Sequence, residues 1–349
     1  MKTVTVNASK SYNILIEKEI LWESGKYVKK ILGNARVCII TDDTVNALYS
    51  KPLEDSLTSQ GISFIKFVIP HGEASKSASN LISLLEFLAS SRITRSDALI
   101  ALGGGVVGDL TGFAAGVYLR GIKFIQIPTT LLAMVDSSVG GKTAINLEAG
   151  KNLAGVFHQP SLVLCDPETL DTLPEDIFAD GCAEVIKYGI INDREFFDLL
   201  KSGIKNNIEV IIERCVKNKA NIVELDEFDL GTRQLLNLGH TIGHAIELCS
   251  DLTISHGSAV AIGTVIATKI AIHLNLCPKN DLDEIINLLK SASLPTECPY
   301  TASELYSVAS ADKKRAGDSI NLILPYGIGN CKLYKVAVSE LEALIEKGL

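Results

Sequence analysis

Residues Ala98 to Asp109 read ALIALGGGVVGD, and this stretch decides the fold of the first half of the chain. The apolar run from Ala98 to Leu102 is typical of a strand that is buried on both faces. Gly103 to Gly108 then match the pattern G-x-G-x-x-G, and an apolar helical pattern follows. Glycines in this position let the backbone approach a pyrophosphate at the amino terminus of a helix. The stretch predicts a strand–turn–helix unit and, as a hypothesis, a dinucleotide site. A tight turn without a ligand is the alternative.

Similar apolar runs lie on either side of this stretch along the chain. Val37 to Ile40, Phe64 to Ile69 and Phe124 to Ile127 are short and rich in β-branched or aromatic residues. Helical patterns such as Leu81 to Ala89 separate them, and this alternation predicts parallel βαβ units. Asp42 follows the first of these runs and is a candidate to bind ribose hydroxyls. The glycine pattern follows a late strand, so a dinucleotide would be bound in a non-standard way.

The second half of the chain has longer helical patterns. They span residues 184–191, 208–223, 232–248, 260–274 and 282–289. At 349 residues the chain is long enough for two domains of ordinary size. The predicted fold class is α/β. An N-terminal Rossmann-like parallel-sheet domain over residues 1–160 is followed by a mostly α-helical C-terminal domain over residues 161–349.

The composition limits the partners of the protein. The formal net charge is -8, so nucleic acid and anionic membrane surfaces would be repelled. No run of about 18 apolar residues is present, so we expect no membrane-spanning helix. Met1 to Ser11 alternates apolar and polar residues as a strand does, and lacks the apolar middle of a signal peptide. The 8 cysteines are scattered without a C-x-x-C pair, so we expect a reducing, cytoplasmic compartment.

A polar stripe is predicted in the helical domain. If residues 233–247 form one helix with about 100° per residue, five polar side chains share a narrow arc. These are Arg233, Asn237, His240, His244 and Glu247. Leucine and isoleucine residues occupy the opposite side, which must face the core. The stripe carries residues that bind anions and metals. An ordinary solvated face is the alternative.

Three of the 6 histidines fall in one short stretch and predict a metal site. His240 and His244 are one helical turn apart, a spacing that can chelate, and His256 can return from the following loop. Glu184 is the candidate carboxylate ligand, and its alternative role is a helical ion pair with Lys187 at i+3. The residues alone leave open which two of the three histidines bind the metal.

Two lysines are flanked by small residues. They lie in Gly140-Gly141-Lys142-Thr143 and in Gly150-Lys151-Asn152. The first segment lacks the upstream glycine of a P-loop, so we reject a nucleotide triphosphatase. Such lysines suit flexible cations that reach an anionic ligand, and ordinary surface lysines are the alternative for each taken singly.

Taken together, these segments resemble the 3-dehydroquinate synthase family over nearly the whole chain. The segments that carry the resemblance are Gly103 to Asp109, Gln126 to Thr143, Gly150 to Leu153, Ala183 to Lys187, Leu236 to Glu247 and Asp312 to Lys314. The resemblance implies the conversion of 3-deoxy-D-arabino-heptulosonate 7-phosphate to 3-dehydroquinate and phosphate, in the shikimate pathway towards chorismate and aromatic amino acids. It also implies the route: transient oxidation by NAD, phosphate elimination, re-reduction and intramolecular aldol closure.

The resemblance implies site residues as well. It assigns Glu184, His240 and His256 to one zinc or cobalt ion, and turns His244 towards the substrate. The other residues implied for the substrate are Lys142, Asn152, Lys187, Lys219, Arg233, Asn237 and Lys313. Those implied for NAD are Glu73, Lys76, Gly104, Gly105, Asp109, Thr129, Thr130, Lys142, Lys151, Thr169, Leu170, Asp171 and Thr172. Arg120 would bind phosphate from the neighbouring subunit of a homodimer, and Asp136 is a further catalytic candidate.

The chain departs from the family pattern at two positions. Asp229 stands where the family usually has glutamate, which shortens the side chain by a methylene and leaves its role at the site open. His71 stands where an acidic residue is common. The rival hypotheses are another sugar-phosphate cyclase, a metal-dependent glycerol or alcohol dehydrogenase, and a pseudoenzyme that binds metal and NAD. Arg233 together with Asn237 favours a carboxylated substrate, and net NADH formation would indicate a dehydrogenase.

Overall fold

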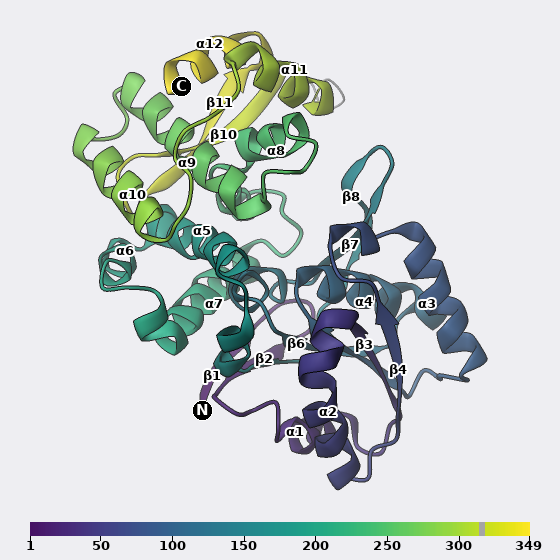
Figure 1. Ribbon diagram of the computed structural model, residues 1–349. Coiled ribbons are helices and arrows are strands. Elements are labelled where there is room, and N and C mark those ends of the chain that lie inside the picture. The colour runs from purple at the N-terminus through teal and green to yellow at the C-terminus, as the bar shows by residue number, and fades with distance from the viewer. Residues whose placement is uncertain (314–317) are drawn as a thin grey trace. The chain divides into compact units, whose positions relative to one another are not determined.

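The computed structural model describes residues 1–313 and 318–349, without the side chains of residues 311–313. The predicted substrate contact of Lys313 and the neighbouring Lys314 therefore lie outside the described residues. The chain divides into two compact units, drawn in Figure 1. Unit 1 comprises Met1–Leu173 and Ile212–Phe228, and unit 2 comprises Pro174–Ile211 and Asp229–Leu349. Among the described helices, none is long and apolar enough to cross a membrane.

Unit 1 is built on a 7-stranded sheet. Its strands are β1 (Lys2–Val6), β2 (Tyr12–Ile16), β3 (Val37–Asp42), β4 (Phe64–Ile69), β5 (Ala98–Gly103), β6 (Lys123–Pro128) and β9 (Leu162–Cys165). They lie in the order β1-β2-β9-β6-β5-β3-β4, and all neighbours pair in parallel except the antiparallel pair β1 and β2. The α/β class is confirmed, as are the predicted strand at the start of the chain and the four between residues 37 and 127.

Helices cover both faces of this sheet. They are α1 (Ser24–Leu32), α2 (Asp43–Ser59), α3 (Ala78–Ser90) and α4 (Gly105–Val117). Successive residues of β5 point to opposite faces, so Ile100 packs in the core with α1 and α2 while Leu99 packs with α3 and α4. Every residue of β5 is buried. This explains why the strand is a continuous apolar run without alternation.

Unit 1 also contains a hairpin and four short helices. The hairpin is the antiparallel pair β7 (Lys142–Leu147) and β8 (Gly150–Phe157). The short helices are η1 (Glu73–Ser75), η2 (Tyr118–Arg120), η3 (Ala133–Ser137) and η4 (Pro167–Thr172). η2 begins directly after α4, and η1, η3 and η4 follow β4, β6 and β9 after short connections.

The sequence predicts that the first domain ends at residue 160, but unit 1 extends beyond this residue. β9 lies between β2 and β6 in the sheet, so residues 162–165 belong to unit 1. The chain returns to unit 1 in α7 (Ile208–Leu225), where Glu213 forms an ion pair of 2.8 Å with Lys2. Glu227 accepts a hydrogen bond of 2.9 Å from Gln159 Nε2. The predicted boundary at residue 160 is therefore wrong. The sequence could not place α7, because a helical pattern does not reveal which core the helix packs against.

Unit 2 is mostly helical. Its elements are α5 (Glu175–Asn192), α6 (Arg194–Leu200), η5 (Lys205–Asn207), η6 (Thr232–Asn237), α8 (His240–Cys249), α9 (His256–His273), α10 (Lys279–Ser291), α11 (Ala302–Lys313), β10 (Ser319–Pro325), β11 (Cys331–Ala337) and α12 (Val338–Gly348). The antiparallel hairpin of β10 and β11 is absent from the sequence analysis. Its first strand ends in a run of four buried residues, so the alternation that signals a strand is weak.

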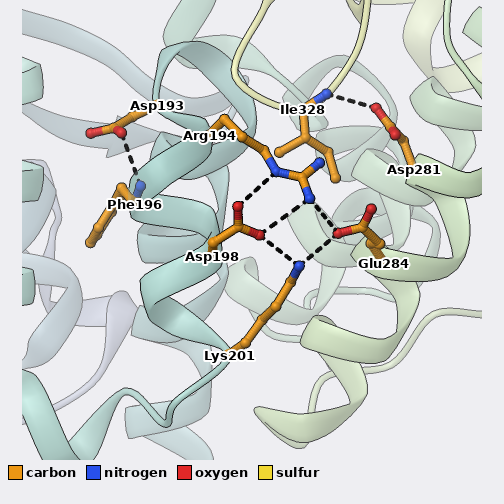
Figure 2. A network of polar contacts seen from close by, with 8 residues as sticks. All are labelled: Asp193, Arg194, Phe196, Asp198, Lys201, Asp281, Glu284 and Ile328. Atoms are coloured by element: carbon orange, nitrogen blue, oxygen red, sulfur yellow. Dashed lines mark hydrogen bonds and ion pairs between the residues drawn. The ribbon is translucent and has the colours of Figure 1, made fainter.

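An ion-pair network joins α6 to α10 on the surface of unit 2, and Figure 2 shows it from close by. Arg194 and Lys201 each contact both Asp198 and Glu284. The distance from Glu284 Oε2 is 2.8 Å to Arg194 Nη2 and 2.6 Å to Lys201 Nζ. All four side chains are between 32% and 47% exposed, so water screens the pairs and each stabilises the unit only slightly.

The predicted single helix over residues 232–248 is wrong. The 3-10 helix η6 ends at Asn237, and α8 begins after Gly239, whose φ is 76°. Close packing explains the break, because a Cβ at Gly239 would lie 2.5 Å from Thr264 Oγ1 and 2.6 Å from the carbonyl oxygen of Val260, both on α9. The predicted polar stripe is therefore split, with its first two members on η6 and its last three on α8.

Candidate metal and dinucleotide sites

Three side chains with metal-ligating atoms meet in unit 2. Glu184 lies on α5, and His240 and His256 are the first residues of α8 and α9. Nε2 of His240 is 3.5 Å from Glu184 Oε1, and Nε2 of His256 is 3.7 Å from the same oxygen. Ligands that hold one zinc ion tetrahedrally at about 2.1 Å lie about 3.4 Å from one another. The donor set and its spacing therefore fit one divalent metal ion.

Glu184 also has the alternative role that the sequence analysis predicts. It forms an ion pair with Lys187, and the two side chains are 1% and 2% exposed. A buried carboxylate needs a cationic partner, so the ammonium group stabilises the charged form that a metal ligand must have. The two roles of Glu184 are compatible.

The turn before α8 fixes the orientation of His240. Nδ1 of the ring is 3.0 Å from the carbonyl oxygen of Leu238, so this nitrogen donates a hydrogen bond and Nε2 carries the free lone pair. Burial lowers the pKa of His240 to about 3, and the positive charge of Lys187 acts in the same direction. The ring is therefore neutral at physiological pH, which is the form that binds metal.

His256 is held at the start of α9 by neighbours of a different kind. Asp180 lies one turn before Glu184 on α5. It accepts hydrogen bonds from Ser255 Oγ (2.6 Å) and from the backbone N of Ser258 (3.2 Å), in the first turn of α9. Burial by itself would lower the pKa of His256, but hydrogen bonds to the carboxylates of Glu184 and Glu247 raise it to about 10. Without a metal the ring is therefore charged, and a metal ion must displace a proton from it.

Ligand atoms of a second group also lie within 4.8 Å of one another: those of His244, Glu247 and His256. His244 is exposed, and its ring centroid is 5.5 Å from that of His240. The spacing on α8 brings His240 and His244 together, and the start of α9 brings His256 to both of them, with ring centroids 5.2 Å and 6.0 Å away. The two groups share His256.

The other predicted substrate residues of unit 2 lie on η6, directly before α8. Arg233 is 2% exposed, and Asn237 is the last residue of η6 and half-buried. Asp229 precedes η6 with a φ of 61°, a left-handed conformation that aspartate tolerates better than most residues. Arg233 and Lys187 are both buried, and Lys187 is paired with the carboxylate of Glu184.

The glycine turn of unit 1 lies at the edge of the sheet where ligands usually bind. β3 pairs with β4 on one side and with β5 on the other, so the strand order reverses at β3. Open α/β sheets bind ligands at the carboxyl ends of strands at such a point. Gly104 caps α4 there, and a Cβ on it would lie 3.0 Å from Thr130 Cγ2. Asp42 ends β3 and already accepts a 2.9 Å hydrogen bond from the backbone N of Val45, which caps α2.

Asn146 connects several of the residues predicted to bind NAD. Its Nδ2 donates to Glu73 Oε1 (2.7 Å), and its backbone N donates to the carbonyl oxygen of Lys76 (2.8 Å). Its Oδ1 accepts from the backbone N of Asn152 (2.9 Å), which has a φ of 57°. Lys76 in turn forms a 2.5 Å ion pair with Asp109. Asn146 is not among the residues predicted from the sequence, because nothing near it in the sequence signals a link to η1.

The remaining predicted residues of unit 1 lie on several other segments. Lys219 Nζ is 2.7 Å from the backbone oxygen of Asp136 and 2.9 Å from its carboxylate. Tyr49 holds η4, which carries Thr169 to Thr172, by a 2.6 Å hydrogen bond to Thr172 Oγ1. Arg120 ends η2 and is exposed, with a φ of 67°. Thr129 follows β6, and its backbone N donates to the carbonyl oxygen of Gly103 (3.1 Å). Gly105 begins α4, Lys142 begins β7 and Lys151 lies in β8.

Two family models match the chain in succession. The one described as 3-dehydroquinate synthase N-terminal matches residues 66–180, and the one described as 3-dehydroquinate synthase C-terminal matches residues 181–315. A curated protein of Clostridium acetobutylicum named 3-dehydroquinate synthase is 44% identical over 348 residues, which cover 97% of this chain and 98% of that protein.

Two solved structures are similar over nearly their whole length. A 2-deoxy-scyllo-inosose synthase complexed with carbaglucose-6-phosphate, NAD+ and Co2+ is 28% identical, with a TM-score of 0.88 and 100% of both chains covered. A 2-epi-5-epi-valiolone synthase from Streptomyces hygroscopicus with NAD+ and Zn2+ bound is 27% identical, with a TM-score of 0.89 and 99% and 98% of the two chains covered.

Proposed function

We propose a function from one premise: the chain belongs to the 3-dehydroquinate synthase family. Its reaction is the conversion of 3-deoxy-D-arabino-heptulosonate 7-phosphate to 3-dehydroquinate and phosphate, which makes it a carbon–oxygen lyase of the shikimate pathway. The observation that carries the proposal is the cluster of Glu184, His240 and His256 in a chain that is 44% identical to a relative of that name.

The cluster would hold one zinc or cobalt ion. Glu184 supplies the anionic ligand, and the two histidines supply neutral nitrogens. When bound, the metal supplies a Lewis acid that polarises a hydroxyl or carbonyl oxygen of the substrate. Zinc and cobalt are the ions in the two similar solved structures, which supports this choice. Lys187, paired with Glu184, keeps a proton donor beside the ligand set.

NAD would bind at the glycine turn of unit 1. Gly104 and Gly105 leave room for the pyrophosphate at the start of α4, and Asp42, Glu73, Lys76, Asp109 and Lys151 are candidates for the other polar groups. Thr129, Thr130 and the segment Thr169 to Thr172 complete the proposed set. When bound, NAD supplies a reversible hydride acceptor, so it is recycled in each turnover. The position at the point of strand reversal supports the proposal.

The substrate carries a carboxylate and a phosphate, so its site must be cationic although the chain carries a net charge of -8. Arg233 has the planar fork that binds a carboxylate with two hydrogen bonds, and Asn237 follows it on the same short helix. Lysines are suited to phosphate as flexible point charges. The proposed lysines are Lys142, Lys187, Lys219 and Lys313, with Asn152, Asp136, Asp229 and His244 as further polar contacts.

We propose a homodimer in which Arg120 reaches the phosphate of the neighbouring subunit. Exposed apolar side chains of unit 1 support an interface: Leu119 beside Arg120 on η2 is 39% exposed, and Leu153 and Phe157 on β8 are 54% and 42% exposed. A mixture of Arg120→Ala and Lys187→Ala chains tests this, because a mixed dimer would regain one intact site. Among the described residues, no disulfide bond joins any of the 8 cysteines, and this supports our proposal of a cytoplasmic compartment.

Phosphate release from the heptulosonate phosphate tests the function. We expect steady release at trace NAD, no accumulation of NADH, and complete loss after treatment with a chelator. NADH that accumulates in proportion to turnover would identify a dehydrogenase instead. No turnover with this substrate, but turnover with a sugar phosphate that lacks a carboxylate, would identify another cyclase. The related cyclases are 27% and 28% identical, well below the 44% of the synthase relative, so we do not favour that alternative.

A further inference from the structure

His256 has an acidic neighbour at each of its two ring nitrogens. Nε2 is 3.7 Å from Glu184 Oε1, and Nδ1 is 3.3 Å from Glu247 Oε2. An imidazole that binds metal through Nε2 must carry its proton on Nδ1, where it needs an acceptor. The carboxylate of Glu247 is in the right position to be that acceptor.

The second histidine of the cluster shows the same arrangement with a different acceptor. His240 directs Nδ1 to the carbonyl oxygen of Leu238 at 3.0 Å, and Nε2 lies 3.5 Å from Glu184 Oε1. Both rings therefore present Nε2 to one carboxylate oxygen while a fixed oxygen holds Nδ1. A backbone carbonyl cannot be changed by mutation, but a glutamate can.

The position of Glu247 links the two histidines. It lies on α8 seven residues after His240, which is two helical turns, so both side chains leave the helix on the same side. Glu247 is 2% exposed. A buried carboxylate is costly unless it is paired, so its burial beside His256 indicates a specific role rather than a solvated face.

We propose that Glu247 is a positioning residue that holds the ring of His256 through Nδ1 so that Nε2 faces Glu184 and His240. This inference rests on the proposed metal site. It differs from the second ligand group, in which Glu247 itself would bind the ion together with His244 and His256. The first group is favoured because its carboxylate faces the Nε2 atoms of two histidines at once.

Titration of the metal-free full-length protein with Co2+ tests the proposal. Glu247→Gln keeps an oxygen that can accept the Nδ1 proton but loses the charge, and Glu247→Leu removes the acceptor. Loss of a group that orients a metal ligand typically weakens binding about 10- to 100-fold. We expect a loss within that range for the leucine variant, a smaller loss for glutamine, and a changed visible absorption spectrum of the bound cobalt.

Ser250→Ala is the matched control for damage to the end of α8. Ser250 Oγ donates to the carbonyl oxygen of Glu247 (2.8 Å) and accepts from the backbone N of Ile254 (3.1 Å), and it has no contact with a ring nitrogen in the described residues. We expect this variant to lower the melting temperature while cobalt affinity and spectrum stay those of the wild type. A structural role alone for Glu247 would give the same result in its own variants.

Two comparisons separate failure of this inference from failure of the metal site. Cobalt affinity that falls in Glu184→Gln but stays within about twofold in both Glu247 variants would overturn the positioning role alone, because an oriented ligand should lose at least about tenfold. Affinity unchanged in Glu184→Gln but abolished in His244→Asn and in Glu247→Leu would move the ion to the second group and overturn both proposals.

Discussion

Each of the two proposed sites lies beside a glycine turn, at Gly104 in unit 1 and at Gly239 in unit 2, and the two turns differ in what lies next to the glycine. At Gly104 the backbone is not left-handed, and the nearest neighbour of an added Cβ would be the side-chain methyl group of Thr130, at 3.0 Å. At Gly239 the backbone is left-handed, and an added Cβ would meet the carbonyl oxygen of Val260 at 2.6 Å. The first turn opens towards the edge of a sheet where a ligand can bind. The second is filled by the neighbouring helix.

The difference separates two ways in which a glycine serves a site. Gly104 leaves space for a ligand, so it contributes to the free energy of ligand binding and little to the stability of the fold. Gly239 lets α8 begin against α9, which brings His240 to within 3.5 Å of Glu184. Gly239 therefore contributes to the stability of the fold itself, before a metal ion binds.

The largest expected effect is on the cluster that Gly239 positions. In Glu184→Gln we expect metal affinity and turnover to fall by at least about 1000-fold, because a neutral amide replaces the one anionic ligand. NAD affinity should stay unchanged, because the glycine turn of unit 1 remains intact. Metal titration, phosphate release and NAD titration of the same variant measure the three quantities. A parallel loss of NAD affinity would show that the two regions are not independent.

The two glycines can be compared directly by alanine substitution. We expect Gly239→Ala to lower the free energy of unfolding by about 3 kcal/mol, from the left-handed backbone and the contacts below 3 Å. Gly104→Ala should change it by less than about 1 kcal/mol but weaken NAD binding about tenfold or more. Urea unfolding and NAD titration provide the measurements.

Gly61→Ala is the control for backbone strain in this comparison. Gly61 has a φ of 66°, and nothing lies within 4 Å of a Cβ placed on it, so it isolates the left-handed cost of about 1–2 kcal/mol. If Gly239→Ala is no more destabilising than Gly61→Ala, close packing on α9 does not explain the turn before α8.

The pH dependence of metal binding should be of intermediate size. The pKa of His240 is lowered to about 3 by burial, and that of His256 is raised to about 10 by Glu184 and Glu247 against the effect of burial. Between these values His256 alone carries a proton that the metal must displace. Affinity should therefore rise about tenfold per pH unit as pH rises from 6 to 8, with release of about one proton. Calorimetry in buffers of different ionisation enthalpy counts the protons, and release of two would mean that His240 is charged as well.

The smallest expected effect comes from the surface network of Figure 2. Lys201→Ala removes contacts to Asp198 and Glu284, but all three side chains are 32% to 47% exposed. We expect a loss of less than about 1 kcal/mol in the free energy of unfolding, smaller still at high salt, and unchanged metal affinity. This variant measures how much the free energy of unfolding changes when only surface ion pairs are lost. A loss as large as that of Gly239→Ala would contradict this ranking.

The sequence predicts the region around Gly104 better than the region around Gly239, for a physical reason. The strand Ala98–Gly103 and its glycine turn depend on neighbours along the chain, so periodicity and turn residues reveal them. The break at Gly239 depends on Val260 and Thr264, which no local pattern connects to it. The family resemblance names Glu184, His240 and His256 together, although the helix assumed from periodicity was wrong. Asn146 and Glu247 act through contacts that only the folded chain reveals.

The return of the chain to unit 1 at Ile212 has a consequence for its synthesis. A ribosome that has made the whole sheet of unit 1 has not yet made Lys219, whose ammonium group bonds to Asp136, or Glu227, which bonds to Gln159. Unit 1 must wait, incomplete, while the first helices of unit 2 emerge. A fragment that ends at Leu173 would lack Lys219 and Glu227 permanently. Each unit is compact but consists of two separate segments of the chain. Neither unit could therefore be transferred to another protein as one continuous piece of sequence.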